Sequence, residues 1–139
     1  MQEFKNTSGR LFVEPQGILH LEFWGVIRTT DFRELYEKAA EIAFENHLMR
    51  WINNQQKVKA IHPEYEHWMA KEYFPKTMKR FEHLGKHYSA HVLSPSFFTE
   101  MSNRRTTSLI LSEKDVNHKI IEIRHFPDTE SARNWLINA

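Results

Sequence analysis

The sequence predicts an α/β domain with a mixed sheet of four to five strands and helices packed on it, in the order ββαβαβαβα. Short segments alternate apolar and polar residues as strands do, and between them apolar residues recur at the three- and four-residue spacing of amphipathic helices. The chain has 139 residues, within the usual domain size of about 100–150 residues. We therefore expect one domain over 1–139, with residues 1–8 disordered or loosely attached.

An antiparallel hairpin is expected first. Residues 10–13 alternate as a short strand, and the Glu-Pro-Gln-Gly segment at 14–17 suits a type I turn, because proline presets φ and glycine favours the fourth position. Residues 18–24 read as the second strand, which Gly25 is expected to end. Its core face carries three apolar side chains: Leu19, Leu21 and Phe23.

The first helix is expected to begin near Asp31, where Asp31 and Glu34 approximate a capping box. Its apolar stripe consists of Phe32, Leu35, Tyr36, Ala39, Ile42 and Ala43. A third strand is predicted at 49–53. The polar residues at 53–57 suit a loop.

Pro63 is expected to start a second helix, because proline fits the first helical position. Phe74 and Pro75 should interrupt that helix, since the residue before proline avoids helical geometry. One or two further turns would carry Met78 and Phe81, before Gly85 caps the helix.

The last third of the chain predicts two more strands and two more helices. A strand is expected at 86–93, followed by a short helix that opens at Ser94-Pro95. Residues 103–117 allow either a continued helix or an edge strand. A strand over 119–126 is then expected to lead into a final helix capped by Asp128.

Composition excludes several classes of protein. The chain has no cysteine, which removes disulfides, thiolate catalysis and cysteine-containing metal sites. The formal net charge is +1, so the basic excess typical of a nucleic-acid-binding protein is missing. No apolar run approaches the ~20 residues of a membrane span, and the N-terminus does not resemble a signal peptide. These features favour a cytoplasmic protein.

Reactive groups do not form a recognisable catalytic pattern. Three of the nine histidines, His83, His87 and His91, are spaced by four, but Gly85 separates the first from the others. No serine lies in a glycine-flanked elbow, and no glycine-rich phosphate loop occurs. The sequence therefore predicts no catalytic residue, metal site or cofactor. An enzyme that uses His87, His91 and nearby carboxylates remains an alternative.

Aromatic residues and methionines crowd the second helical region and the segment after Ser94. They are too many, and too widely spread around the helix, for one buried stripe, so we expect some to line a cavity, reach solvent or meet a second subunit. The predicted ligand- or partner-binding residues are Tyr65, Trp68, Met69, Tyr73, Phe74, Met78, Phe97 and Phe98. The leading hypothesis is a non-enzymatic binding or regulatory module that holds an apolar small molecule or a protein partner. The alternative is a homodimer formed through the same face.

Two segments carry a family resemblance. The stretch Gly25-Val26-Ile27-Arg28-Thr29-Thr30-Asp31-Phe32 and the tail from Phe126-Pro127-Asp128 to Ala132-Arg133-Asn134-Trp135-Leu136 resemble the first-helix entry and the ending of SpoIIAA-like proteins of the STAS (sulfate transporter and anti-sigma-factor antagonist) superfamily. The resemblance implies a sheet with helices packed on it and no inherent enzyme activity. It also implies binding to a partner, a phosphorylatable hydroxyl after the third strand, and, through related lipid-transfer folds, an apolar pocket. The corresponding loop, 54–61, contains no serine or threonine to receive a phosphate.

Overall fold

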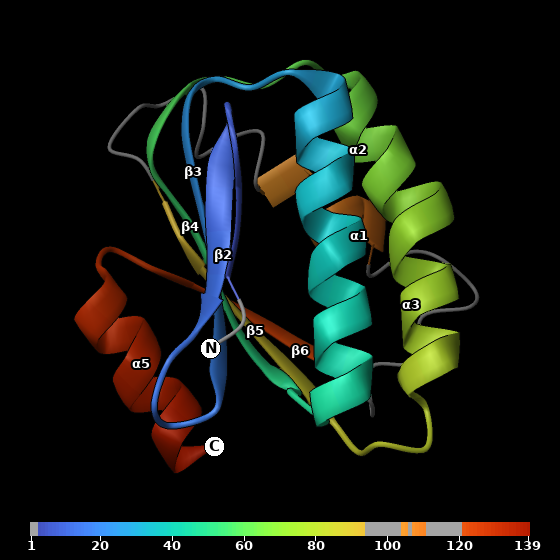
Figure 1. Ribbon diagram of the computed structural model, residues 1–139, viewed down its shortest axis with the longest axis vertical. Helices are drawn as coiled ribbons and strands as arrows, with labels where there is room; N and C mark the ends of the chain where they lie inside the picture. The colour runs from blue at the N-terminus through green and yellow to red at the C-terminus, as the bar shows by residue number, and fades with distance from the viewer. Residues whose placement is uncertain (1–2, 94–103, 106, 111–120) are drawn as a thin grey trace.

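The computed structural model describes residues 3–93, 104–105, 107–110 and 121–139. It shows one six-stranded mixed sheet with helices on both faces (Figure 1). The strands lie in sequence order across the sheet: β1 Glu3–Asn6, β2 Gly9–Val13, β3 Ile18–Val26, β4 Arg50–Ala60, β5 His87–Val92 and β6 Ile121–Phe126. The strands β1 to β3 pair antiparallel, and β3 to β6 pair parallel. The α/β class is confirmed, but the described residues form six strands where four to five were expected.

The helices divide between the two faces of the sheet. They are α1 Thr29–Asn46, α2 Glu64–Trp68, η1 Met69–Tyr73, α3 Phe74–Phe81 and α5 Thr129–Asn138. Residues 104–105 and 107–110 are also helical. In Figure 1, α1 and the α2–η1–α3 segment lie on one side of the sheet and α5 lies on the other. The predicted helix at Ser94-Pro95 falls outside the described residues.

The N-terminal residues form a strand, so the expectation of a loose segment over 1–8 is wrong for the described part of it. β1 pairs with β2 from Glu3 opposite Phe12 to Asn6 opposite Gly9. The Asn6 side chain donates to the backbone oxygen of Asp31, 3.0 Å away at the start of α1. A side chain at Gly9 would collide with the backbone oxygen of Glu22. These contacts come from residues distant in sequence, which is why local composition did not reveal the strand.

Two strands run further than predicted. β3 continues through Gly25, which adopts a positive φ of 68° inside the strand and coincides with a register shift against β4. β4 extends to Ala60, so the polar residues 53–57 lie in a strand and not in a loop. Their side chains are accommodated by tertiary hydrogen bonds, described below.

The start of α1 also differs from the predicted capping box. Arg28 occupies the N-cap position without a capping side chain. The Asp31 carboxylate instead accepts a hydrogen bond from the Ser8 hydroxyl at 3.1 Å. Asp31 therefore ties the β1–β2 turn to the helix. At the other end of the chain, Asp128 caps α5 as predicted and accepts from the Ser131 N–H at 2.7 Å.

The helix over residues 64–81 is not broken at Phe74-Pro75. A π-helical turn, η1, joins α2 to α3, and the Phe74 N–H bonds to the oxygen of Met69, five residues back. Proline lacks an N–H and its ring clashes with the carbonyl four residues earlier in an α-helix. Wider hydrogen bonding ahead of Pro75 relieves that conflict, so the helical segment continues.

The core lies mainly between the sheet and the α1–α3 side. The large cluster on this face includes the predicted strand residues Leu19, Leu21 and Phe23, each at 0% exposure. The opposite face has a smaller cluster, made by Ile18, Ile52, Ala90, Val92, Ala132 and Leu136. Those of the predicted binding residues that the structure describes lie in the large cluster.

Candidate functional site

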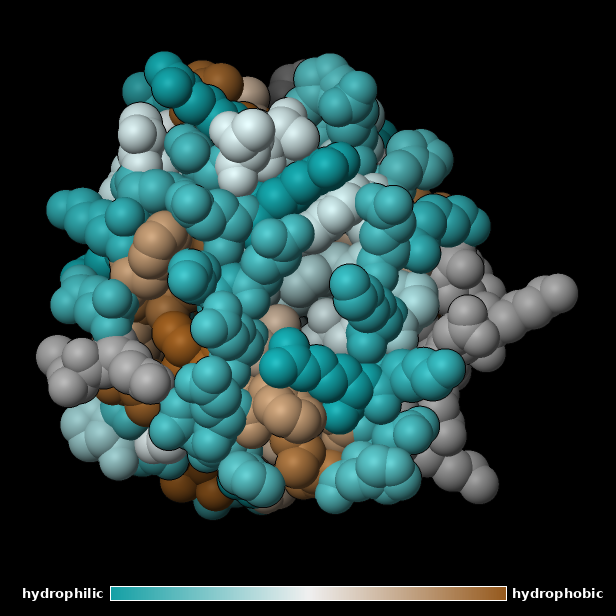
Figure 2. Space-filling view, turned by 45° about the vertical axis from the view of Figure 1, so that its right-hand side comes forward, coloured by the Kyte–Doolittle hydropathy of each residue, from teal (hydrophilic) through white to brown (hydrophobic). Residues whose placement is uncertain are grey.

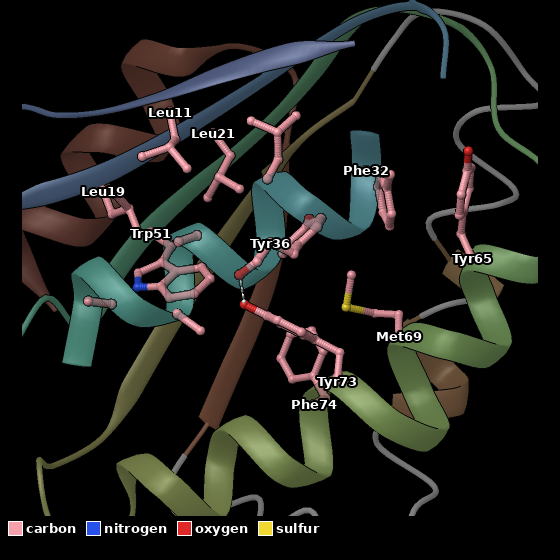
Figure 3. Packing of buried hydrophobic residues seen from close by; sticks show 14 of the residues in the cluster. Leu11, Leu19, Leu21, Phe32, Tyr36, Trp51, Tyr65, Met69, Tyr73 and Phe74 are labelled. Atoms are coloured by element: carbon pink, nitrogen blue, oxygen red, sulfur yellow. Dashed lines mark hydrogen bonds between the residues drawn. The ribbon is translucent and has the colours of Figure 1, made fainter. Parts of the chain in front are cut away.

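The predicted aromatic face points into the protein. Tyr65, Trp68, Met69, Tyr73, Phe74 and Met78 are each between 1% and 8% exposed. Figure 3 shows them, apart from Trp68 and Met78, directed from the helical segment toward α1 and the sheet. These six residues are therefore buried, and their role in binding a ligand or partner stays a prediction. Phe97 and Phe98 lie outside the described residues.

The rings pack against α1 in a connected stack. Tyr65 stacks on Phe32 with ring centres 4.4 Å apart, and Tyr73 meets Tyr36 edge-on at 5.2 Å. The ring centres of Trp68 and Tyr73 lie 5.1 Å apart. Such pairs add stability beyond the area that they bury. The stack fixes the position of Trp68 and Tyr73 beside α1.

Buried tyrosine hydroxyls hold this stack to the backbone. The Tyr73 hydroxyl donates to the backbone oxygen of Tyr36 at 2.7 Å, the dashed line in Figure 3. The Tyr65 hydroxyl donates to the oxygen of Ile27, also at 2.7 Å. Burial raises the pKa of Tyr73 well above its ordinary value, so this hydroxyl stays protonated and remains a donor.

A groove runs between α1 and the helical segment at the outer edge of this stack. It has a volume of about 530 Å³. Its lining residues are Glu37, Ala40, Trp68, Glu72, Tyr73, Lys76, Thr77 and Arg80. Trp68, Tyr73, Ala40 and Thr77, all below 9% exposure, form the floor. The charged side chains form the rim. We call this feature the α1–α3 groove.

The rim carries both signs of charge. Glu37 comes from α1, whereas Lys76 and Arg80 lie one turn apart on α3. The Arg80 guanidinium lies over the Phe44 ring at 4.2 Å. A second hollow of about 440 Å³ continues past Trp68, where Arg33 lies over the indole ring at 5.4 Å. Trp68 is therefore shared by both hollows.

The surface around the groove is mostly hydrophilic. Figure 2 shows the helical side covered by charged and polar side chains, with apolar colour confined to narrow strips between them. Among the described residues, the large exposed apolar side chains are Val26, Phe44 and Ile137, one each on β3, α1 and α5. Scattered apolar residues of this kind do not form the contiguous patch typical of a protein interface.

A row of polar side chains crosses the middle of the sheet. The Tyr36 hydroxyl donates to Asn53 Oδ1 at 2.6 Å, and Asn53 Nδ2 donates to Ser89 Oγ at 2.8 Å. Ser89 Oγ lies 3.1 Å from His91 Nε2. Central parallel strands usually carry apolar runs, because both of their faces are buried. The hydrogen bonds explain how Asn53 is tolerated at 1% exposure.

His87 and His91 share a face of β5 but have different surroundings. His87 is buried against Trp51 and Phe81, and its Nδ1 lies 3.0 Å from the oxygen of Met49. Burial lowers the pKa of His87 to about 4. Its Nε2 has no hydrogen-bond partner among the described residues. Among the described residues, these contacts include no carboxylate, and His87 packs as a core residue does.

The opposite face of the sheet holds a charged cluster that the sequence did not indicate. Glu14 accepts two hydrogen bonds from Arg133, at 2.6 and 3.0 Å, and lies 2.7 Å from His20 Nδ1. Burial raises the pKa of Glu14, but the contacts with Arg133 and His20 outweigh it and the net pKa is lowered. Burial lowers the pKa of His20. The cluster joins α5 to the β2–β3 turn.

Comparison with known proteins does not place the chain in a family. No family model, no curated protein and no solved structure matches it. Within the described residues, no group of three or more metal-ligating side chains comes together. No helix in that part of the chain has both the length and the apolar character needed to cross a membrane.

The groove is lined by two of the predicted binding residues, and its charged rim was not predicted. Trp68 and Tyr73 were predicted, whereas the charged lining residues had the appearance of an ordinary solvated helix surface. One signal was available: Glu72, Lys76 and Arg80 recur at four-residue spacing and so share one helix face. That Glu37 faces them depends on how α1 packs, which local spacing does not reveal.

Proposed function

We propose that the protein is a non-enzymatic cytoplasmic binding module whose ligand occupies the α1–α3 groove. The observation that carries the proposal is the groove itself, which has an aromatic floor of Trp68 and Tyr73 and a charged rim. Small-molecule sites are typically concave, with apolar and aromatic linings and a few placed polar groups. A volume of about 530 Å³ falls within the usual range for such sites, roughly 300–1,000 Å³.

The π-helical turn supports a functional role for this location. Interruptions of this kind often occur at functional sites, because they cost helix stability and re-aim the side chains around them. Trp68, Glu72 and Tyr73 lie at or beside η1, and all three line the groove.

The rim favours a ligand with an apolar body and an anionic end. Lys76 and Arg80 lie one turn apart, so both can contact one anionic group. Neither of these cations forms an ion pair with a carboxylate in the described part of the chain. The two acidic rim residues, Glu37 and Glu72, come from different helical elements. An apolar body would rest on the indole of Trp68.

Binding of anionic amphipaths tests this proposal. The probe is 8-anilinonaphthalene-1-sulfonate, followed by fluorescence, with decanoate as the competitor. We expect the folded protein to bind the probe at one site and decanoate to displace it. Lys76→Glu should weaken binding about tenfold, because it places a like charge beside the anion.

Lys79→Glu is the matched control, because it makes the same charge change on an exposed position of α3 outside the groove. It should leave the affinity within about twofold. Equal loss in the two variants would show that the probe responds to overall charge and not to the groove. No saturable binding to the wild-type chain would refute the proposal.

On the motifs at its two ends, we also propose that the chain is a remote SpoIIAA-like member of the STAS superfamily. The Thr29-Thr30-Asp31-Phe32 motif lies at the start of α1, and the Ala-x-x-Trp-Leu motif, 132–136, lies in α5. A binding role without enzyme activity agrees with that assignment. Detection of sequences that link this chain to established members by intermediate similarity would test it.

A further inference from the structure

We propose that His91 and His125 chelate one divalent transition-metal ion at the β5–β6 edge of the sheet. The two residues are direct register partners on adjacent parallel strands, so their side chains project from the same face. Their ring centres lie 5.6 Å apart, with an angle of 74° between the rings. This site is separate from the α1–α3 groove.

The separation of the rings fits one shared ion. Metal–nitrogen bonds are about 2.0–2.1 Å, and a ring nitrogen lies ~1.2 Å from its ring centre, so two imidazoles on a tetrahedral ion have centres about 5.3 Å apart. The observed 5.6 Å differs from this value by a few tenths of an ångström. The metal bond would replace whatever hydrogen bond the coordinating nitrogen makes in the metal-free chain.

Hydrogen bonds already orient both imidazoles. His91 Nε2 lies 3.1 Å from Ser89 Oγ, at the end of the buried row that begins at Tyr36 and passes through Asn53. His125 Nε2 lies 3.2 Å from Thr107 Oγ1. Metal-binding histidines generally have their second ring nitrogen held by such a partner, which fixes the ring and its tautomer. The row gives the buried polar residues of β4 and β5 a purpose beyond packing.

One of the two imidazoles reaches solvent, and the site has few protein ligands. His91 is 6% exposed, whereas His125 lies at the surface on β6. Because the described residues supply no third histidine or carboxylate to such a group, water would complete the coordination. Imidazole ligands favour Ni²⁺, Cu²⁺ and Zn²⁺, while Mg²⁺ prefers oxygen. We therefore expect binding of the first group and not of Mg²⁺.

Calorimetric titration of the untagged chain with NiCl₂ tests the proposal, with MgCl₂ as the control ion. We expect one Ni²⁺ per chain and no heat from Mg²⁺ binding. His125→Ala should raise the dissociation constant at least tenfold, and its surface position means that the variant should fold. His83→Ala removes an exposed histidine outside the pair, with a side chain 89% exposed, and should leave the affinity unchanged.

Ser89 is a positioning residue in this account. Ser89→Ala should weaken Ni²⁺ binding roughly tenfold, because it removes the partner that orients His91. A merely structural serine would change stability and leave the affinity alone. Retention of wild-type Ni²⁺ affinity by His125→Ala would overturn the proposal, as would equal losses in His125→Ala and His83→Ala.

Discussion

The two faces of the sheet are covered in different ways. On the α1–α3 face, a large apolar cluster is filled by aromatic rings from α1, the helical segment and the strands. On the α5 face, a much smaller cluster is accompanied by the charged contacts of Glu14, His20 and Arg133. Apolar burial dominates the first face, whereas a short helix on the second depends also on ionic contacts.

The residues that stabilise the fold are therefore mostly different from those that line the groove. Burial of apolar surface is non-directional and contributes about 25 cal/mol per Å², so the larger cluster should supply most of the stability. The groove lies at the outer edge of that cluster, where charged side chains from α1, η1 and α3 line it. The aromatic residues thus support the site from below, and among those that the structure describes only Trp68 and Tyr73 reach its floor.

The largest expected effect is loss of a ring from the α1–α3 face. Phe81, which is 1% exposed, packs against Trp51 with ring centres 6.3 Å apart. Phe81→Ala should cost about 3–5 kcal/mol of unfolding free energy, through lost burial and the cavity left behind. Leu136→Ala, on α5, should cost less, about 2–3 kcal/mol. Urea denaturation measures both, and a larger loss for Leu136→Ala would contradict the comparison.

Acidification should act next most strongly, through His87. Its pKa is lowered from 6.5 to about 4 by burial, so the unfolded chain binds more protons between these values. Stability therefore rises with pH in this window and is lost as the pH falls from 7 to 4, by about 3 kcal/mol. His87→Leu removes this titration and should flatten the pH dependence of the urea midpoint. An unchanged slope in that variant would disprove the assignment.

On the α5 face, removal of one ionic partner should have a smaller effect. Arg133→Met leaves the Glu14 carboxylate, 8% exposed, without the two hydrogen bonds that Arg133 donates to it. We expect a loss of about 2 kcal/mol. The control Lys57→Met removes a cation that is 69% exposed and 3.9 Å from Glu22. It should change the free energy of unfolding by less than about 0.5 kcal/mol. Equal losses in the two variants would show that the buried pair of Glu14 and Arg133 stabilises the fold no more than an exposed pair does.

The smallest effect concerns a single buried hydroxyl. Tyr73→Phe removes the hydrogen bond to the backbone oxygen of Tyr36 and keeps the ring in the stack. We expect a loss of about 1 kcal/mol, measured by urea denaturation. A loss above roughly 3 kcal/mol would mean that the hydroxyl, and not the ring, holds the helical segment on α1.

The elements that sequence predicted well are those determined by their own side chains. The apolar stripe of α1 and the capping aspartate of α5 are local patterns, and each appears in the structure. β1 is a four-residue strand stabilised by its pairing with β2 and by contacts to α1. Its short polar sequence carries no equivalent signal.

Elsewhere, tertiary contacts overrode local preference. Asn53 was assigned to the junction of a strand and a loop, but hydrogen bonds from Tyr36 and to Ser89 make it a buried strand residue. At Pro75, the π-helical turn resolved a conflict that normally ends a helix. For the candidate site, aromatic composition identified Trp68 and Tyr73. The charged rim residues could not be predicted without knowing how α1 and α3 pack together.

The indole N–H resonances of the four tryptophans test the central claim most directly. Trp24, Trp51, Trp68 and Trp135 lie in four different places, and only Trp68 lines the α1–α3 groove. Titration of ¹⁵N-labelled protein with 8-anilinonaphthalene-1-sulfonate should shift the Trp68 resonance in a saturable way while the other three stay in place. A stationary Trp68 resonance, or equal shifts of all four, would contradict binding in the groove.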